Sequence, residues 1–237
     1  MRIGILSAIP EEIQPFPELE KTQYRILETP LFKIKHPQHE LFLIAGGLGK
    51  VNSAIASTLL IREHRIDFLI NAGIAGSLDS GLDLEEVFYG NRLIQYDYGS
   101  LKEGEMHVYP AGSIPMGQER DPALTLPLWL EMQMQKEVFG IHPATILSGD
   151  IFLQCKLQRE KLRERFQAHL VDMESAAVAQ VSSRMKVPFL AIRAISDLVG
   201  EHSGRVPRGQ LKKAAAASVK GVMKILEALP SEITAEP

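Results

Sequence analysis

Three acidic residues lie where an apolar run gives way to a helix or a turn. Glu12 follows the run Ile3–Leu6, Asp197 follows the run Phe189–Ile195, and Glu174 precedes a stretch of small residues. In an open α/β sheet, ligands bind beyond the carboxyl ends of the strands, so side chains at such positions meet around a ligand. Carboxyl groups in one closed pocket act as general acids and bases when their surroundings push their pKa values apart.

Each acid also has a purely structural interpretation. Acidic residues in the first turn of a helix stabilise the helix dipole, which would account for Glu12 after Pro10 and for Glu174. Asp197 would cap a following helix. However, Arg193 interrupts the same apolar strand, and a buried guanidinium needs a partner. We therefore favour a functional interpretation for Asp197, and for Glu12 and Glu174 both interpretations stay open.

Two more strand ends carry weaker signals. The run Asn71–Gly76 enters closely spaced glycines, which let backbone N–H groups approach a ligand. Phe152 follows the run Ala144–Leu147, and its ring could stack on a planar base, although core packing is the simpler explanation. The segment Gly46–Lys50 lacks the spacing of a dinucleotide fingerprint, and Val51 stands where a phosphate-binding loop needs Ser or Thr. That segment indicates a tight turn before a helix.

Short apolar or β-branched runs alternate with longer helical patterns, which is typical of an α/β fold. The runs that predict strands are Ile3–Leu6, Leu41–Ala45, Asp67–Asn71, Val87–Ile94, Ala144–Leu147 and Phe189–Ile195. The patterns that predict helices are Val51–Glu63, Ala176–Met185 and Gln210–Leu229. The segment 95–127 is richer in Gly, Pro, Tyr and polar residues, so we expect an excursion that helps to build a binding site.

Composition sets limits on the kind of protein. The chain has 237 residues, of which 45% are hydrophobic, and we expect one domain over residues 1–229 with a disordered tail at 230–237. A net charge of -3 without a basic stripe argues against nucleic acid as a partner. We expect no membrane span and, with a lone Cys155, no internal disulfide, so the cytoplasm is the expected compartment. The seven histidines are scattered, so neither a metal nor a cofactor is expected.

Several motifs together resemble the nucleosidases that act on methylthioadenosine and S-adenosylhomocysteine, within the purine nucleoside phosphorylase superfamily. The matching segments, in order along the chain, are residues 4–12, 47–51, 71–76, 148–152, 172–174 and 187–197. The resemblance implies an α/β fold, namely a three-layer α/β/α sandwich around a twisted mixed sheet, usually as a homodimer. Residues 95–140 do not align, so their role stays open.

The resemblance also implies how the base is held. Asp197 would be the general acid that protonates N7 of the departing purine, and Ser196 would hold the Asp197 side chain in place. Phe152 would stack on the base. In the glycine loop ending at Gly76, this chain has Ile74 where the nucleosidases often have Ser, which removes a hydroxyl group near the ribose and the water.

The remaining implied roles concern the sugar and the water. Glu174 would accept hydrogen bonds from the ribose hydroxyls, with Met173 beside the sugar, and would favour the positive charge that develops on the ring. Glu12 would orient and deprotonate the attacking water. Arg193 is expected among the substrate-binding residues. Asp197 must hold a proton at neutral pH, whereas Glu12 and Glu174 should be ionised in the free enzyme.

The expected activity is hydrolysis of the N-glycosidic bond of a 5′-substituted adenine nucleoside, such as methylthioadenosine or S-adenosylhomocysteine. One alternative is a hydrolase of futalosine or of an adenosyl lipid. Another is a phosphate-dependent purine nucleoside phosphorylase, which needs cations around the phosphate; Arg92 could supply one, but the Glu12 carboxylate would repel the anion. A third alternative is a non-catalytic nucleoside-binding protein, against which the joint presence of Glu12, Glu174 and Asp197 argues.

Overall fold

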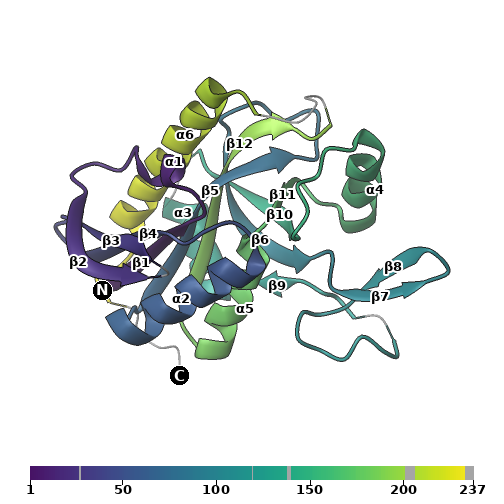
Figure 1. Cartoon of the computed structure of the whole chain (residues 1–237), viewed down its shortest axis with the longest axis horizontal. Helices are drawn as coiled ribbons and strands as arrows, with labels where there is room; N and C mark the ends of the chain where they lie inside the picture. Colours follow the sequence, from purple (N-terminus) through teal and green to yellow (C-terminus); the bar gives the residue numbers. More distant parts are fainter. Residues whose placement is uncertain (27, 119, 138–139, 201–205, 233–237) are drawn as a thin grey trace.

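A large mixed sheet with helices on both faces forms the body of the molecule (Figure 1). The structure, a computed structural model, describes residues 1–26, 28–118, 120–137, 140–200 and 206–232. The strands of the large sheet are β1 (Arg2–Ser7), β2 (Glu20–Ile26), β3 (Thr29–Ile34), β4 (Glu40–Ala45), β5 (Phe68–Ser77), β6 (Val87–Gln95), β9 (Leu124–Thr125), β10 (His142–Ser148), β11 (Leu170–Asp172) and β12 (Phe189–Leu198). Two further strands, β7 (Gly99–Lys102) and β8 (Glu105–Val108), form a separate hairpin.

The strand order brings the predicted strand ends together. The order is β11-β10-β6-β12-β5-β1-β4-β3-β2, and the strands β12, β5, β1 and β4 at its centre are parallel. Strand β11 pairs with β10 and also, through Val171 and Gly76, antiparallel with β5. This second pairing closes one part of the sheet on itself. The residues that end β1, β5, β11 and β12 therefore surround one region.

The helices form the two outer layers. On one face lie α1 (Pro10–Ile13), α3 (Leu128–Glu137) and α6 (Arg208–Ala228), and on the other lie α2 (Lys50–His64) and α5 (Ser175–Met185). Successive residues of a strand point to opposite faces. Accordingly, Leu41 and Leu43 of β4 belong to the core under α6, whereas Phe42 and Ile44 belong to the core under α2 and α5. The predicted three-layer α/β/α architecture around a mixed sheet is confirmed.

Some elements differ from the sequence predictions. All six predicted strands and all three predicted helices are present, but the hairpin of β2 and β3, the strand β11, and the helices α3 and α4 (Lys156–Phe166) were not predicted. The glycines of Asn71–Gly76 do not end a strand, because β5 continues to Ser77 between its neighbours β1, β12 and β11. The segment that the resemblance treats as a glycine loop is therefore part of a strand.

The ends of the chain and the excursion complete the description. The backbone amine of Met1 donates to the carbonyl of Ser231 at 3.0 Å, so the first part of the predicted tail is tied to the body, and residues 233–237 lie outside the described residues. The β7–β8 hairpin projects from the body in Figure 1. Within the described ranges, no helix is long and apolar enough to cross a membrane, and no group of three or more His, Cys, Asp or Glu side chains could hold a metal ion.

Candidate active site

Glu12, Glu174 and Asp197 line one cavity of about 460 Å³ at the carboxyl ends of the central strands. A fourth acid, Asp172, lines the same cavity. The other predicted site residues on its wall are Phe152, Met173, Ser196, Gly76 and Ile74. Four carboxyl groups around so small a volume favour binding of a group that is, or becomes, positively charged.

Glu12 is held by three backbone N–H groups. One carboxylate oxygen, Oε2, accepts from Ala8 at 2.8 Å and from Ile9 at 3.1 Å, and the other, Oε1, accepts from Ile74 at 2.9 Å. Burial raises the pKa of Glu12, while the charge of Arg193 and these three hydrogen bonds act in the opposite direction. The structural and the functional interpretation of Glu12 are therefore compatible. Glu12 caps the short helix α1 and also lines the cavity.

Glu174 stands just before helix α5, and its carboxylate meets the turn that precedes helix α2. Its Oε1 accepts from the backbone N–H of Gly49 at 2.9 Å. The segment Gly46–Lys50, which the sequence indicates as a tight turn, thus supplies a donor to the site. Burial, followed by the charge of Asp172, raises the pKa of Glu174 to about 7. A carboxyl group with this pKa exchanges its proton near neutral pH, and the expectation that Glu174 is ionised in the free protein stays a prediction.

A bulge in strand β12 presents Ser196 and Asp197 to the cavity. Ile195 pairs with Ala75 and Asp197 pairs with Gly76, so Ser196 is an extra residue between two paired positions. Such a bulge redirects the side chains that follow it. The Ser196 hydroxyl donates to Asp197 Oδ1 at 2.6 Å and lies 3.2 Å from the carbonyl oxygen of Ala75. The Asp197 carboxyl group is thereby held against the strand and toward the cavity.

Arg193 lies behind the cavity wall and is not among its lining residues. It is 2% exposed, and its Nε donates to Asp172 Oδ2 at 2.8 Å. Its terminal nitrogens donate to the side-chain and backbone oxygens of Asn71. The buried guanidinium has the partner that its burial requires, but that partner is Asp172 rather than Asp197. This pairing was not predicted from the sequence, although the need of a buried guanidinium for a partner was a signal.

The walls between the acids are apolar. Ile9, Leu48 and Leu211 lie among them, and Phe152, with 57% of its surface exposed, lies at the rim. None of the described lining residues is a Lys, Arg or His. Arg92 lines a different pocket and forms an ion pair with Asp121 at 3.1 Å. The described part of this cavity therefore offers no side-chain cation to an anionic ligand.

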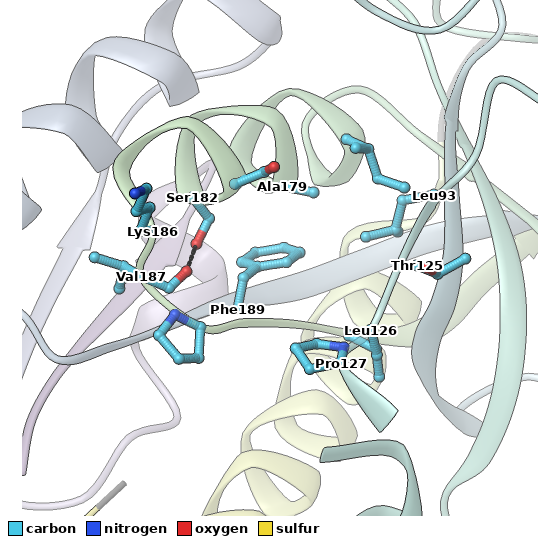
Figure 2. Close-up of a pocket in the computed structure, with 12 residues that line it drawn as sticks. Leu93, Thr125, Leu126, Pro127, Ala179, Ser182, Lys186, Val187 and Phe189 are labelled. Carbon is cyan, nitrogen blue, oxygen red and sulfur yellow. Dashed lines mark hydrogen bonds between the residues drawn. The ribbon is translucent and has the colours of Figure 1, made fainter. Parts of the chain in front are cut away.

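A second, smaller pocket of about 310 Å³ lies elsewhere (Figure 2). Figure 2 shows the ring of Phe189 at its centre, below Ala179 of α5, with Leu126 and Pro127 on the other side. The Ser182 hydroxyl donates to the carbonyl of Val187 at the end of α5. Because Phe189 begins β12, whereas Asp197 lies near its other end, this pocket is separate from the cavity that holds the acids.

Comparisons with known proteins identify the family of the chain. The family model described as "Phosphorylase superfamily" matches residues 2–230. A 5′-methylthioadenosine/S-adenosylhomocysteine nucleosidase of Staphylococcus epidermidis is 32% identical, covering 96% of this chain and all of that protein. An aminodeoxyfutalosine nucleosidase of Campylobacter jejuni is 32% identical, covering 85% of this chain and 87% of that protein.

A solved structure has the same fold over almost the whole chain. It is a 5′-methylthioadenosine/S-adenosylhomocysteine nucleosidase from S. pneumoniae with a transition-state inhibitor, and it matches with a TM-score of 0.82, 27% sequence identity, and coverage of 97% of this chain and 100% of that chain. The chain therefore belongs to the phosphorylase superfamily and, within it, to the 5′-methylthioadenosine/S-adenosylhomocysteine nucleosidase family of N-glycosyl hydrolases.

Proposed function

We propose that this chain hydrolyses the N-glycosidic bond of a 5′-substituted adenine nucleoside and releases the free base. The observation that carries the proposal is the single cavity into which Glu12, Glu174 and Asp197 converge, without a cation among its described lining residues. Cleavage of the bond from ribose to base leaves positive charge on the sugar, and nearby carboxylates stabilise that charge. A phosphorylase would instead need cations to bind phosphate in the same place.

Each acid has a distinct part in the reaction. Asp197, oriented by Ser196, donates a proton to N7 of the purine as the bond between C1′ and N9 breaks. Water attacks C1′, and Glu12 takes the proton that the water loses. Glu174 accepts hydrogen bonds from the ribose hydroxyls, which requires its ionised form. Met173 lies beside the sugar.

The apolar walls suggest how the two ends of the nucleoside lie. In this proposal Phe152, which lines the cavity, stacks on the base. Ile9, Leu48 and Leu211 make part of the cavity wall apolar, and such a wall favours an apolar 5′ substituent. We therefore propose methylthioadenosine first and S-adenosylhomocysteine second. A futalosine-type nucleoside is the alternative substrate, because the relative from Campylobacter jejuni is an aminodeoxyfutalosine nucleosidase. An adenosyl lipid would also present an apolar group.

The test is release of free base from methylthioadenosine, S-adenosylhomocysteine, adenosine and a futalosine-type nucleoside, each with and without phosphate. Release that does not depend on phosphate supports a hydrolase and ranks the substrates. Release only with phosphate would replace the proposal with a phosphorylase. Binding without release from any of the four nucleosides would favour a nucleoside-binding protein.

We also propose that the protein is a single-domain homodimer of the cytoplasm. Val51 and Ile55 on helix α2, and Leu48 just before it, are 69%, 40% and 56% exposed. Val51 and Ile55 are one helical turn apart on α2, and Leu48 lines the cavity, so we propose that a second copy covers these exposed apolar side chains. A molar mass of two chains from light scattering supports the proposal, and a mass of one chain would overturn it.

A further inference from the structure

Asp172 is a buried carboxylate in the cavity wall that the proposed mechanism does not use. Its side chain is 2% exposed. It ends strand β11, where it pairs with Ser148 of β10. The next residues are Met173 and Glu174, so Asp172 lies at the corner that carries the ribose-binding acid.

Both carboxylate oxygens of Asp172 are occupied by hydrogen-bond donors. Oδ1 accepts from the Ser148 hydroxyl at 2.5 Å and from the backbone N–H groups of Glu174 and Ser175, each at 3.2 Å. Oδ2 accepts from Arg193 Nε at 2.8 Å and from the Ser175 hydroxyl. One carboxylate therefore fixes both the backbone of the corner and the guanidinium behind it.

These contacts determine which hydrogen-bond donors are available to the Glu174 carboxylate. The Arg193 guanidinium makes four hydrogen bonds, with its Nε on Asp172 and its terminal nitrogens on Asn71 and on the carbonyl of Ile192, and none of them goes to Glu174. Among the described residues, Gly49 N–H is the donor seen on the Glu174 carboxylate. Glu174 therefore keeps lone pairs for the ribose hydroxyls, because no ion pair with Arg193 consumes them.

We propose that Asp172 is a positioning residue, which holds Arg193 away from Glu174 and holds the corner that aims Glu174 at the ribose. This inference rests on the proposed function. The charged groups that face Glu174 are Asp172 from β11, Arg193 from β12 and Glu12 from α1, and the turn before α2 adds only a backbone donor. Removal of the Asp172 charge therefore leaves less negative charge beside Glu174, which favours the ionised form of Glu174.

The experiment is the pH profile of kcat/KM for Asp172→Asn, Asp172→Glu and the native protein, with methylthioadenosine as substrate. In Asp172→Asn the repulsion from Asp172 is gone, and the charge of Arg193 acts on Glu174 and Glu12 without a carboxylate beside it. Both changes stabilise the ionised carboxylates, so the acid limb moves to lower pH by about one unit, and kcat/KM at its plateau falls roughly 10- to 100-fold. In Asp172→Glu the acid limb of the profile stays at its native pH, because this substitution keeps the negative charge.

Asp79→Asn is the matched control, because Asp79 pairs with Arg163 outside the cavity, and it leaves the profile unchanged. A profile of Asp172→Asn equal to that of the native protein, or no restoration by Asp172→Glu, would overturn the inference.

If Asp172→Asn does not fold, Ser148→Ala takes its place. It removes one hydrogen-bond donor and no charge, so kcat/KM falls about threefold or more while the acid limb stays at the same pH. A Ser148→Ala variant with native kcat/KM would also overturn the inference. Absence of base release by the native protein, in contrast, would refute the proposed function itself.

Discussion

Gly73 has no room for a side chain, because the carboxylate of Glu12 occupies the space. A Cβ atom on residue 73 would lie 2.4 Å from Glu12 Oε1 and 3.0 Å from its carboxyl carbon. Since a carbon and an oxygen in contact lie about 3.4 Å apart, Gly73→Ala moves the carboxylate by about 1 Å. The backbone itself tolerates alanine, because Gly73 is not among the described residues with positive φ.

The displacement has a calculable consequence for catalysis. Oε1 leaves the Ile74 N–H, now at 2.9 Å, beyond hydrogen-bond reach, and it also leaves the place from which Glu12 meets the water. A catalytic group misplaced by about 1 Å loses on the order of 100-fold in rate. We expect kcat to fall by that factor, and the free energy of unfolding by about 1–3 kcal/mol from the lost hydrogen bond to a charged group.

The assay is steady-state release of adenine from methylthioadenosine, together with denaturant unfolding. Gly209→Ala is the control, because no atom of the described residues, apart from the backbone of its own helix and its chain neighbours, lies within 4 Å of a Cβ placed there. In a protein that already carries Glu12→Gln, the additional Gly73→Ala change should cost far less than 100-fold, because both changes act on the same group. Native turnover by Gly73→Ala, or a full additional loss in the double variant, would refute the role of Glu12.

Three further predictions concern substitutions of the acids themselves. Asp197→Asn should lower kcat at least 1000-fold, which is of the order expected for loss of a general acid, and should leave the circular dichroism spectrum unchanged. Near-native turnover by this variant would mean that another residue is the general acid. Glu12→Gln should lower kcat on the order of 100-fold while the dissociation constant of an unreactive nucleoside analogue changes less than threefold, and loss of binding with native turnover would contradict this. The folded-state pKa of Glu174 is raised from 4.5 to about 7, so its ionisation opposes folding as pH rises through that window. Glu174→Gln should therefore raise the melting temperature at pH 8 more than at pH 5. An equal effect at both pH values would contradict the raised pKa of Glu174.

The parts of the site that the sequence predicted are those that local signals encode. Glu12 after Pro10, and Asp197 after a mostly apolar run, became candidates because a helix start and the end of an apolar run are each visible in a short window, although Asp197 itself lies within β12. Arg193 was noticed for the same reason, since a charge in an apolar strand breaks the pattern. Strand β11 has only three residues, and no window that short distinguishes a strand from a loop.

The parts that were missed depend on residues far apart in the chain. The donor on Glu174 is a backbone N–H 125 positions away, and the partner of Arg193 is chosen by the closure of β11 onto β5. The bulge at Ser196 exists because β12 must pair with β5 on both sides of it, and nothing in the local sequence requires the extra residue. The pKa of Glu174 combines both kinds of cause: burial inside the closed sheet raises it most, and the charge of Asp172, only two residues earlier in the chain, adds to that. The neighbouring acid is visible in the sequence, whereas the burial depends on strands that are far apart in the chain.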